Sequence, residues 1–253
     1  MRQDETVFIT RSDMEKGLRD LGLQQGMMVE VHSSLSSFGI VDGGAETVIQ
    51  ALMNIVGKEG TIVMTAFPMS APLPLTPLDM ERGLTYKVKI FHDDFYERSC
   101  MGIISDTFRK MPDVKTGEGL HRVAAWGKDA QIHYKGLHHL IAQDGWGLLL
   151  GVDIYRLTSM HYVESKLPDK VRDIFKPSDK VNLIYPPDEW YIETGKPPVK
   201  AWYTIQNEAY EKGFIQDGYI GNSKCMFFKV RDVIGLYEHA LESDPLGLYG
   251  LKP

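Results

Sequence analysis

The stretch MMVEVHSSLSSFGIVDGGAETVIQALMNIVGKEGTIVMTA, residues 27–66, predicts the fold class of this chain. Residues 27–31 form a short apolar run, as expected of a buried strand. Residues 45–56 repeat apolar side chains at helical spacing, and residues 57–60 turn the chain into a second apolar strand at 61–66. A strand, a helix and a strand in this order predict two parallel strands joined by a right-handed crossover.

The rest of the chain continues to mix helical and strand patterns, which predicts an α/β protein with a mixed, partly parallel central sheet flanked by helices. Residues 67–85 contain four prolines and show no clean periodicity, which predicts a long loop. We expect further helices at 12–21, 101–111, 128–142, 206–212 and 231–241, and further strands at 123–126, 148–152, 181–185, 189–193, 199–205 and 225–230. Residues 1–253 are predicted to form one domain with a β-rich elaboration towards the C-terminus, an insertion at about 175–205.

Composition narrows the function classes. The chain has 253 residues, 43% of them hydrophobic, and a net charge of −6, which argues against nucleic acid or an anionic membrane as the main partner. Its two cysteines imply neither a disulfide framework nor a cysteine-based zinc site. Because no apolar segment follows residues 1–5 and no run reaches the length of a membrane span, we expect a cytoplasmic protein.

The best candidate for chemistry is a histidine and a glutamate that follow the apolar strand at 148–152. His161 and Glu164 are three residues apart, so on a helix they share a face. A carboxylate beside an imidazole can fix its tautomer and leave the far nitrogen free to accept a proton. Many such pairs are solvated ion pairs, and the local pattern alone leaves that alternative open.

The serine- and glycine-rich loop after the first strand is the second candidate. It comprises His32, Ser33, Ser34, Leu35, Ser36 and Ser37, followed by Gly43 and Gly44 at the start of the helix. Hydroxyls, backbone N–H groups and a helix N-terminus can together hold phosphate oxygens. No Walker or dinucleotide-binding motif is present, and a plain connection with a structural cap is an equally good interpretation.

Several motifs in order resemble the aminoglycoside 3-N-acetyltransferase family, also called the antibiotic N-acetyltransferase family. The resemblance runs from about residue 10 to residue 241, over nearly the whole chain. The motifs are HSSLSSFG at 32–39, GGAETVI at 43–49, GTIVM at 60–64, MGIIS at 101–105, AAWG at 124–127, LLLGV at 148–152, SMHYVE at 159–164 and GNS at 221–223.

The resemblance implies transfer of an acetyl group from acetyl-coenzyme A to an amine of an aminoglycoside, through a ternary complex. His161 would be the general base and Glu164 its orienting carboxylate. The serine loop, Gly43 and Gly44, with Met101 and Asn222, would bind the coenzyme. Asp153, Tyr162 and His121 would face the acceptor, and we expect a monomer or a homodimer.

Departures from the family pattern leave the acceptor open. The segment before the AAWG strand keeps only His121 of two histidines typical of the family. The same chemistry on a different amine, a non-catalytic coenzyme A or ligand binder, and a hydrolase or metal enzyme remain as alternatives. No metal site is predicted, because His133, His138 and His139 on the expected 128–142 helix lack a third ligand and fit a solvated face.

Overall fold

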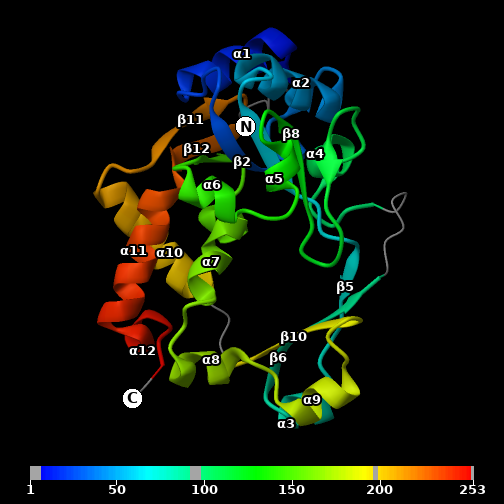
Figure 1. Cartoon of the computed structure of the whole chain (residues 1–253), viewed down its shortest axis with the longest axis vertical. Helices are drawn as coiled ribbons and strands as arrows, with labels where there is room; N and C mark the ends of the chain where they lie inside the picture. The colour runs from blue at the N-terminus through cyan, green and yellow to red at the C-terminus, as the bar shows by residue number, and fades with distance from the viewer. Residues whose placement is uncertain (1–6, 92–97, 196–198, 252–253) are drawn as a thin grey trace, which may run out of the picture.

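The computed structural model describes residues 7–91, 98–195 and 199–251, and its centre is a seven-stranded mixed sheet (Figure 1). The strand order is β11 (Gln216–Ile220), β12 (Ser223–Lys229), β9 (Trp146–Leu150), β2 (Met28–Ser33), β4 (Thr61–Thr65), β8 (Val123–Gly127) and β7 (Lys115–Thr116). Strand β2 runs parallel to both β4 and β9, and the other pairs are antiparallel. The predicted α/β class and the parallel β2–β4 pair are confirmed.

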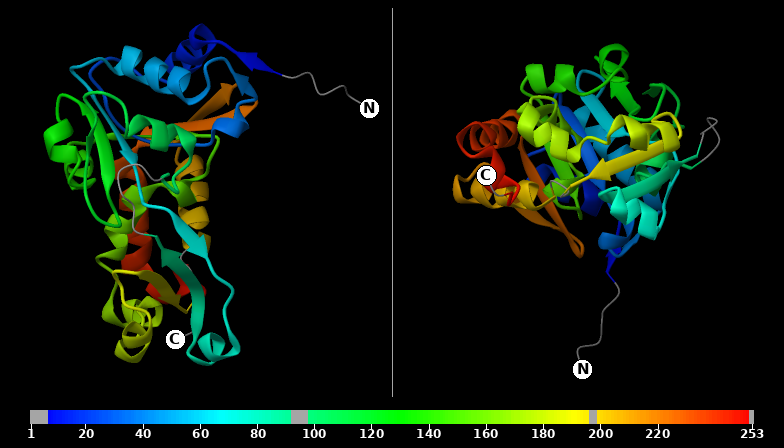
Figure 2. Two further views of the ribbon diagram at one scale, coloured as in Figure 1. Left: turned by 90° about the vertical axis from the view of Figure 1, so that its right-hand side faces the viewer. Right: turned by 90° about the horizontal axis from the view of Figure 1, so that it is seen from below.

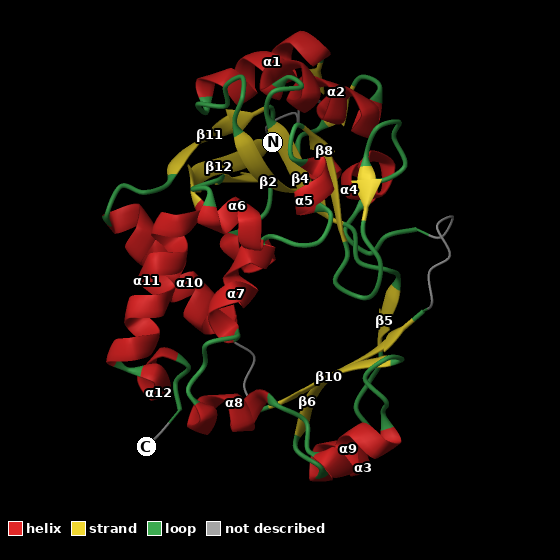
Figure 3. Ribbon diagram, in the orientation of Figure 1, coloured by secondary structure: helices red, strands yellow, loops and turns green. Residues whose placement is uncertain are grey.

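The central strands read as continuous apolar runs because both faces of the sheet are covered. In β9, Leu148 and Leu150 enter one hydrophobic cluster and Leu149 enters the other. The helices divide in the same way (Figure 3). One face carries α1 (Arg11–Asp20), α2 (Gly44–Val56) and α4 (Ile103–Phe108); the other carries α5 (Ala130–His133), α6 (His138–Ala142), α7 (His161–Glu164), α10 (Val199–Glu211) and α11 (Val230–Ser243).

A small lobe extends from this body along the long axis of the molecule (Figure 2, left). It contains a three-stranded antiparallel sheet in the order β10 (Trp190–Thr194), β6 (Leu84–Ile90) and β5 (Ser70–Pro72). Around it lie α3 (Pro77–Glu81), α8 (Asp169–Phe175) and α9 (Asp179–Ile184). Its apolar cluster has only three buried members, Leu84, Val181 and Ile192.

A buried polar group supplements this small core. Asp79 of α3 has no solvent-exposed side-chain surface and accepts hydrogen bonds from Lys87 Nζ at 2.5 Å and from the Tyr185 hydroxyl. Thr76, which caps α3, donates to the same carboxylate. Burial favours the neutral acid, but these donors outweigh it and lower the pKa of Asp79 well below its usual range.

Several expected elements were wrong in type or extent. Residues 67–85 contain β5 and α3 rather than one loop, and residues 128–142 form two short helices, α5 and α6. Two of the three strands expected in the β-rich insertion are helical: 181–185 lies largely in α9 and 199–205 in α10, so only β10 is a strand there. The predicted insertion also includes residues 196–198, which lie outside the described residues.

The errors have a physical cause. Residues 199–205 are rich in β-prone side chains, but Ala201, Trp202 and Ile205 share one helical face that packs into the core next to α11. Tertiary burial therefore overrides local propensity. In α9, Ser178 accepts a hydrogen bond from the Val181 amide, an N-cap that a reading of the apolar residues alone does not detect.

Across the described ranges, every helix is too short or too polar to cross a membrane. Residues 1–6, which include the segment used to predict the absence of an apolar leader, lie outside the described residues.

Candidate functional site

A cavity of about 660 Å³ opens beside the carboxyl end of β2. Six of the residues predicted to bind a cofactor line it: His32, Ser33, Ser34, Leu35, Ser36 and Met101. Four others, Ser37, Gly43, Gly44 and Asn222, are not among its described lining residues. The front of the serine loop and Met101 therefore share one cavity.

Ser37 holds the loop in place. Its hydroxyl donates to the Ser34 carbonyl at 2.7 Å and lies 2.8 Å from the Ser223 hydroxyl. Gly151 follows β9 at φ +71°, and a Cβ there would lie 1.8 Å from Ser37 Oγ. On the same side, the Asn222 amide donates to the Phe38 carbonyl at 3.0 Å. These contacts give Ser37 and Asn222 a structural function, whether or not they touch a ligand.

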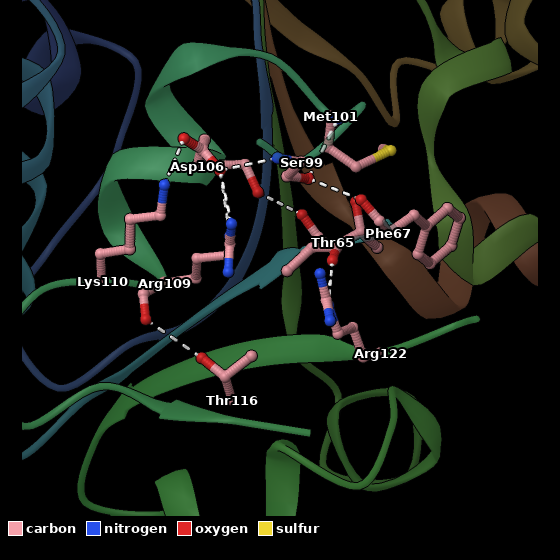
Figure 4. A network of polar contacts seen from close by, with 11 residues as sticks. Thr65, Phe67, Ser99, Met101, Asp106, Arg109, Lys110, Thr116 and Arg122 are labelled. Atoms are coloured by element: carbon pink, nitrogen blue, oxygen red, sulfur yellow. Dashed lines mark hydrogen bonds and ion pairs between the residues drawn. The ribbon is translucent and has the colours of Figure 1, made fainter. Parts of the chain in front are cut away.

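A polar network fixes the segment that brings Met101 to the cavity (Figure 4). Asp106 of α4 accepts a hydrogen bond from the Ser99 amide at 2.7 Å and one from Lys110 Nζ at 3.0 Å. Ser99 Oγ donates to the Phe67 carbonyl and accepts from the Met101 amide. Burial opposes ionisation of Asp106, but its donors prevail and lower its pKa. The wall of the cavity is therefore tied to the end of β4.

Two arginines that the sequence did not single out as ligands also line the cavity. Arg98 and Arg156 are both exposed, and the Arg156 guanidinium lies 4.5 Å from the ring centroid of Tyr155. Their charge suits an anionic ligand such as a phosphate. They belong to no recognisable motif, so a single sequence carried no signal for them.

The predicted His161–Glu164 pair forms at the start of α7. His161 Nδ1 lies 2.6 Å from Glu164 Oε2. Because a carboxylate only accepts, Nδ1 carries the proton in the neutral ring and Nε2 is left as an acceptor. The edge of this ring packs against Trp202, with centroids 4.9 Å apart. About half of the His161 side chain, 51%, is exposed, so a substrate can reach it.

Several acidic groups act on His161. Desolvation is the largest influence and favours the neutral ring, but the hydrogen bond and charge of Glu164 outweigh it, and Glu193 and Glu30 add to their effect. The net result raises the pKa of His161 above its ordinary value of 6.5. The imidazolium is thus stabilised, which suits a base that gains a proton during the reaction.

Beneath the site lies a buried network that the sequence analysis missed. Glu30 on β2 is fully buried, and its Oε1 lies 2.7 Å from His32 Nε2. Ser159 donates to the same carboxylate through both its amide, at 3.2 Å, and its hydroxyl. Since Ser159 stands two residues before His161, this carboxylate connects the cavity at His32 to the turn that positions the base.

The small lobe supplies an acidic and aromatic wall. Tyr191 of β10 donates a hydrogen bond to Glu193, and its ring lies 6.0 Å from that of Tyr86 on β6. Burial is the main cause of a raised pKa at Glu193, and Glu164 and His161 both act electrostatically on this residue. The sequence predicted the strand but carried no signal that its side chains lie close to His161.

The three predicted acceptor residues occupy different positions. His121 packs edge-on against Phe67, and burial together with the charge of His161 lowers its pKa, which places it near the base. Tyr162 contacts the ring of His138. Asp153 is exposed and accepts a 3.4 Å hydrogen bond from Tyr203.

Comparisons with known proteins show the family of this chain and agree with its fold. Residues 31–242 match the sequence model of the family described as Aminoglycoside 3-N-acetyltransferase. The SPbeta prophage-derived aminoglycoside N(3')-acetyltransferase-like protein YokD of Bacillus subtilis (strain 168) is 28% identical over 90% of this chain and 91% of its own. Aminoglycoside N(3)-acetyltransferase III of Acinetobacter baumannii is 25% identical over 89% of this chain and 88% of its own.

Solved structures show the same fold. The crystal structure of YokD superposes with a TM-score of 0.72 at 26% identity, covering 95% of this chain and 96% of its own. AAC-IIIb, solved as a binary complex with CoASH, gives a TM-score of 0.69 at 20% identity over 93% of this chain and 97% of its own. The chain belongs to the aminoglycoside 3-N-acetyltransferase family and is an N-acetyltransferase.

Proposed function

We propose that this protein transfers the acetyl group of acetyl-coenzyme A to an amine of an aminoglycoside, the 3-amino group of 2-deoxystreptamine, within a ternary complex. The observation that carries the proposal is the 2.6 Å contact between His161 Nδ1 and Glu164 Oε2 at a half-exposed position. Both residues belong to a chain of the aminoglycoside 3-N-acetyltransferase family, in which acetyl transfer to an amine is the expected reaction.

The pair performs the proton transfer. The lone pair of the acceptor amine forms a C–N bond to the thioester carbonyl carbon, and Nε2 of His161 takes the proton that the amine loses. Glu164 holds the Nδ1 proton and stabilises the imidazolium. The tetrahedral oxyanion then collapses, the C–S bond breaks, and coenzyme A leaves as a thiolate that the proton on His161 neutralises. No covalent enzyme intermediate is needed.

The cavity beside β2 fits the coenzyme. Ser34 and Ser36 present hydroxyl groups at its edge, and Arg98 and Arg156 supply positive charge for the phosphates. The CoASH complex of AAC-IIIb, which shares this fold, supports a coenzyme A ligand. The Glu30–His32–Ser159 network joins this cavity to His161, so the thioester and the base can meet at one place.

The surroundings of His161 fit a polycationic acceptor. Glu164 and Glu193 bring negative charge, and Tyr191, which is bonded to Glu193, adds aromatic surface together with Tyr86. Aminoglycosides carry several ammonium groups, which such a wall attracts. Relatives named aminoglycoside N(3)-acetyltransferases support the same acceptor class.

Thiol release tests the proposed function. Acetyl-coenzyme A with kanamycin or gentamicin should give one coenzyme A thiol per acetylated drug, detected by a thiol reagent and by mass spectrometry, and EDTA should leave the rate unchanged. Turnover of other amines but of no aminoglycoside would contradict the proposed acceptor and leave the proposed acetyl transfer standing. Coenzyme binding without turnover on a broad amine panel would contradict both.

The pH profile of kcat/KM tests whether His161 is the general base. Activity should fall on the acid side as His161 becomes protonated, because only the neutral ring accepts a proton. Glu164→Gln removes the carboxylate that contributes most to raising the pKa of His161, so the acid limb should move to lower pH while the plateau rate falls about 10- to 100-fold. An acid limb that stays in place would show that another group titrates there.

A further inference from the structure

One histidine side chain is buried against the sheet and lacks a hydrogen-bond partner among the described residues. His133 at the end of α5 has no exposed surface, and within the described part of the chain neither of its ring nitrogens makes a hydrogen bond. An unpaired buried polar group costs about 1–3 kcal/mol. The expectation of a solvated face was therefore wrong for His133.

Two further ligand-type side chains converge on this ring. One ligand atom each from Asp129, His133 and His139 all lie within 4.8 Å of one another, and the two imidazole rings are 4.9 Å apart. Sequence reasoning found the histidines but placed no third ligand. The break between α5 and α6 turns His139 back towards His133 and completes the set.

Asp129 is set up as a ligand rather than as a cap. It occupies the N-cap position of α5, where aspartate usually accepts a backbone hydrogen bond, yet its side chain makes no capping bond. Among the described residues both ring nitrogens of His133 lack a hydrogen-bond partner, so either one can give its lone pair to a metal ion in the neutral ring.

We propose that Asp129, His133 and His139 bind a divalent zinc-type metal ion. Two imidazoles and a carboxylate form a donor set that zinc uses, with a water molecule completing a tetrahedral site. In such a site the donor atoms lie about 3.4 Å apart, so the side chains close by about 1 Å around the ion. Asp129 and His139 are only partly buried, which leaves a route for the ion.

The ion would join two helices that are too short to be stable alone. Helix α5 has four residues and α6 has five, and helices of this length depend on tertiary contacts. His138, at the start of α6, packs against Tyr162 beside His161. Zinc would thus stabilise α5 and α6, and the site is separate from the cavity and from the proposed acetyl transfer.

Zinc binding to the full chain tests this proposal directly. Protein treated with EDTA and dialysed is expected to bind one Zn²⁺ per chain in equilibrium dialysis with metal analysis. At free zinc a hundred times the Kd, the Tm should rise by about 5–10 °C. Absence of stoichiometric zinc, or an unchanged Tm, would overturn the proposal.

Matched variants locate the site. His139→Gln and Asp129→Asn keep the size of partly buried side chains and should lose the stoichiometric zinc and the rise in Tm. His138→Gln, one position away on the same helix, should keep both. Zinc that persists in His139→Gln, or that is lost equally in His138→Gln, would place the ion elsewhere and contradict the assignment.

Discussion

Replacing His161 by alanine is expected to lower kcat/KM for acetyl transfer by about a thousandfold. The substitution removes the half-exposed imidazole that Glu164 holds through a 2.6 Å contact. The amine must then lose its proton to water, while the cavity proposed for the coenzyme is unchanged. The loss should therefore fall on kcat, with little change in the affinity for acetyl-coenzyme A measured by calorimetry.

A matched control separates chemistry from folding. His239 is an exposed histidine on α11, and His239→Ala should retain wild-type kcat and KM. His161→Ala should keep the wild-type Tm within a few degrees, since half of its side chain is exposed. A loss of less than tenfold in a folded His161→Ala protein would show that another group accepts the proton.

The local part of this site could be predicted from the sequence. His161 and Glu164 lie on one helical turn, so their spacing alone places them side by side. The serine loop follows β2 directly, and its position at the end of that strand comes from the strand–helix–strand pattern. In both cases the chain brings the groups together within a few residues.

The contacts between residues far apart in the sequence could not be predicted. Glu193 affects His161 only because the fold brings β10 of the small lobe within electrostatic range of that ring. Glu30 reaches Ser159 across 129 positions of sequence. Glu30 also sits in an apolar strand where a carboxylate has no local explanation. Contacts of this kind depend on topology, which the pattern of one sequence fixes only partly.

The small lobe was also hard to predict, because its apolar core is small and is supplemented by a buried ion pair. With three buried apolar residues it offers little hydrophobic periodicity. An ion pair between Asp79 of α3 and Lys87 of β6, eight residues apart in sequence, joins the helix to the small sheet. Neither residue stands out as buried in the sequence, since lysine and aspartate are rarely found in cores.

Asp79→Ala is therefore expected to destabilise the protein by about 3 kcal/mol. The substitution leaves Lys87 buried without its counter-charge and removes the acceptor for Tyr185 and Thr76. This value is at the low end of the cost of removing one partner of a buried ion pair, because the lobe is thin and water can reach the vacated site. Urea unfolding followed by tryptophan fluorescence measures the change, and Trp190 in β10 reports on this lobe.

Surface acids provide the comparison. Asp169 pairs with Arg172 on α8, but its side chain is 88% exposed, so Asp169→Ala should cost less than about 1 kcal/mol. Equal effects of the Asp79 and Asp169 substitutions would show that burial of Asp79 adds nothing.

The pH dependence of stability gives a sharper distinction. Because folding lowers the pKa of Asp79, its stabilising effect is fully present above the unfolded value of about 3.9 and is lost as the pH falls towards the folded value. The wild-type protein should lose this contribution below about pH 4, whereas Asp79→Asn, which cannot ionise, should be less stable near neutrality and converge with the wild type in acid. Parallel curves for the two proteins would mean that the carboxylate charge does not stabilise the lobe.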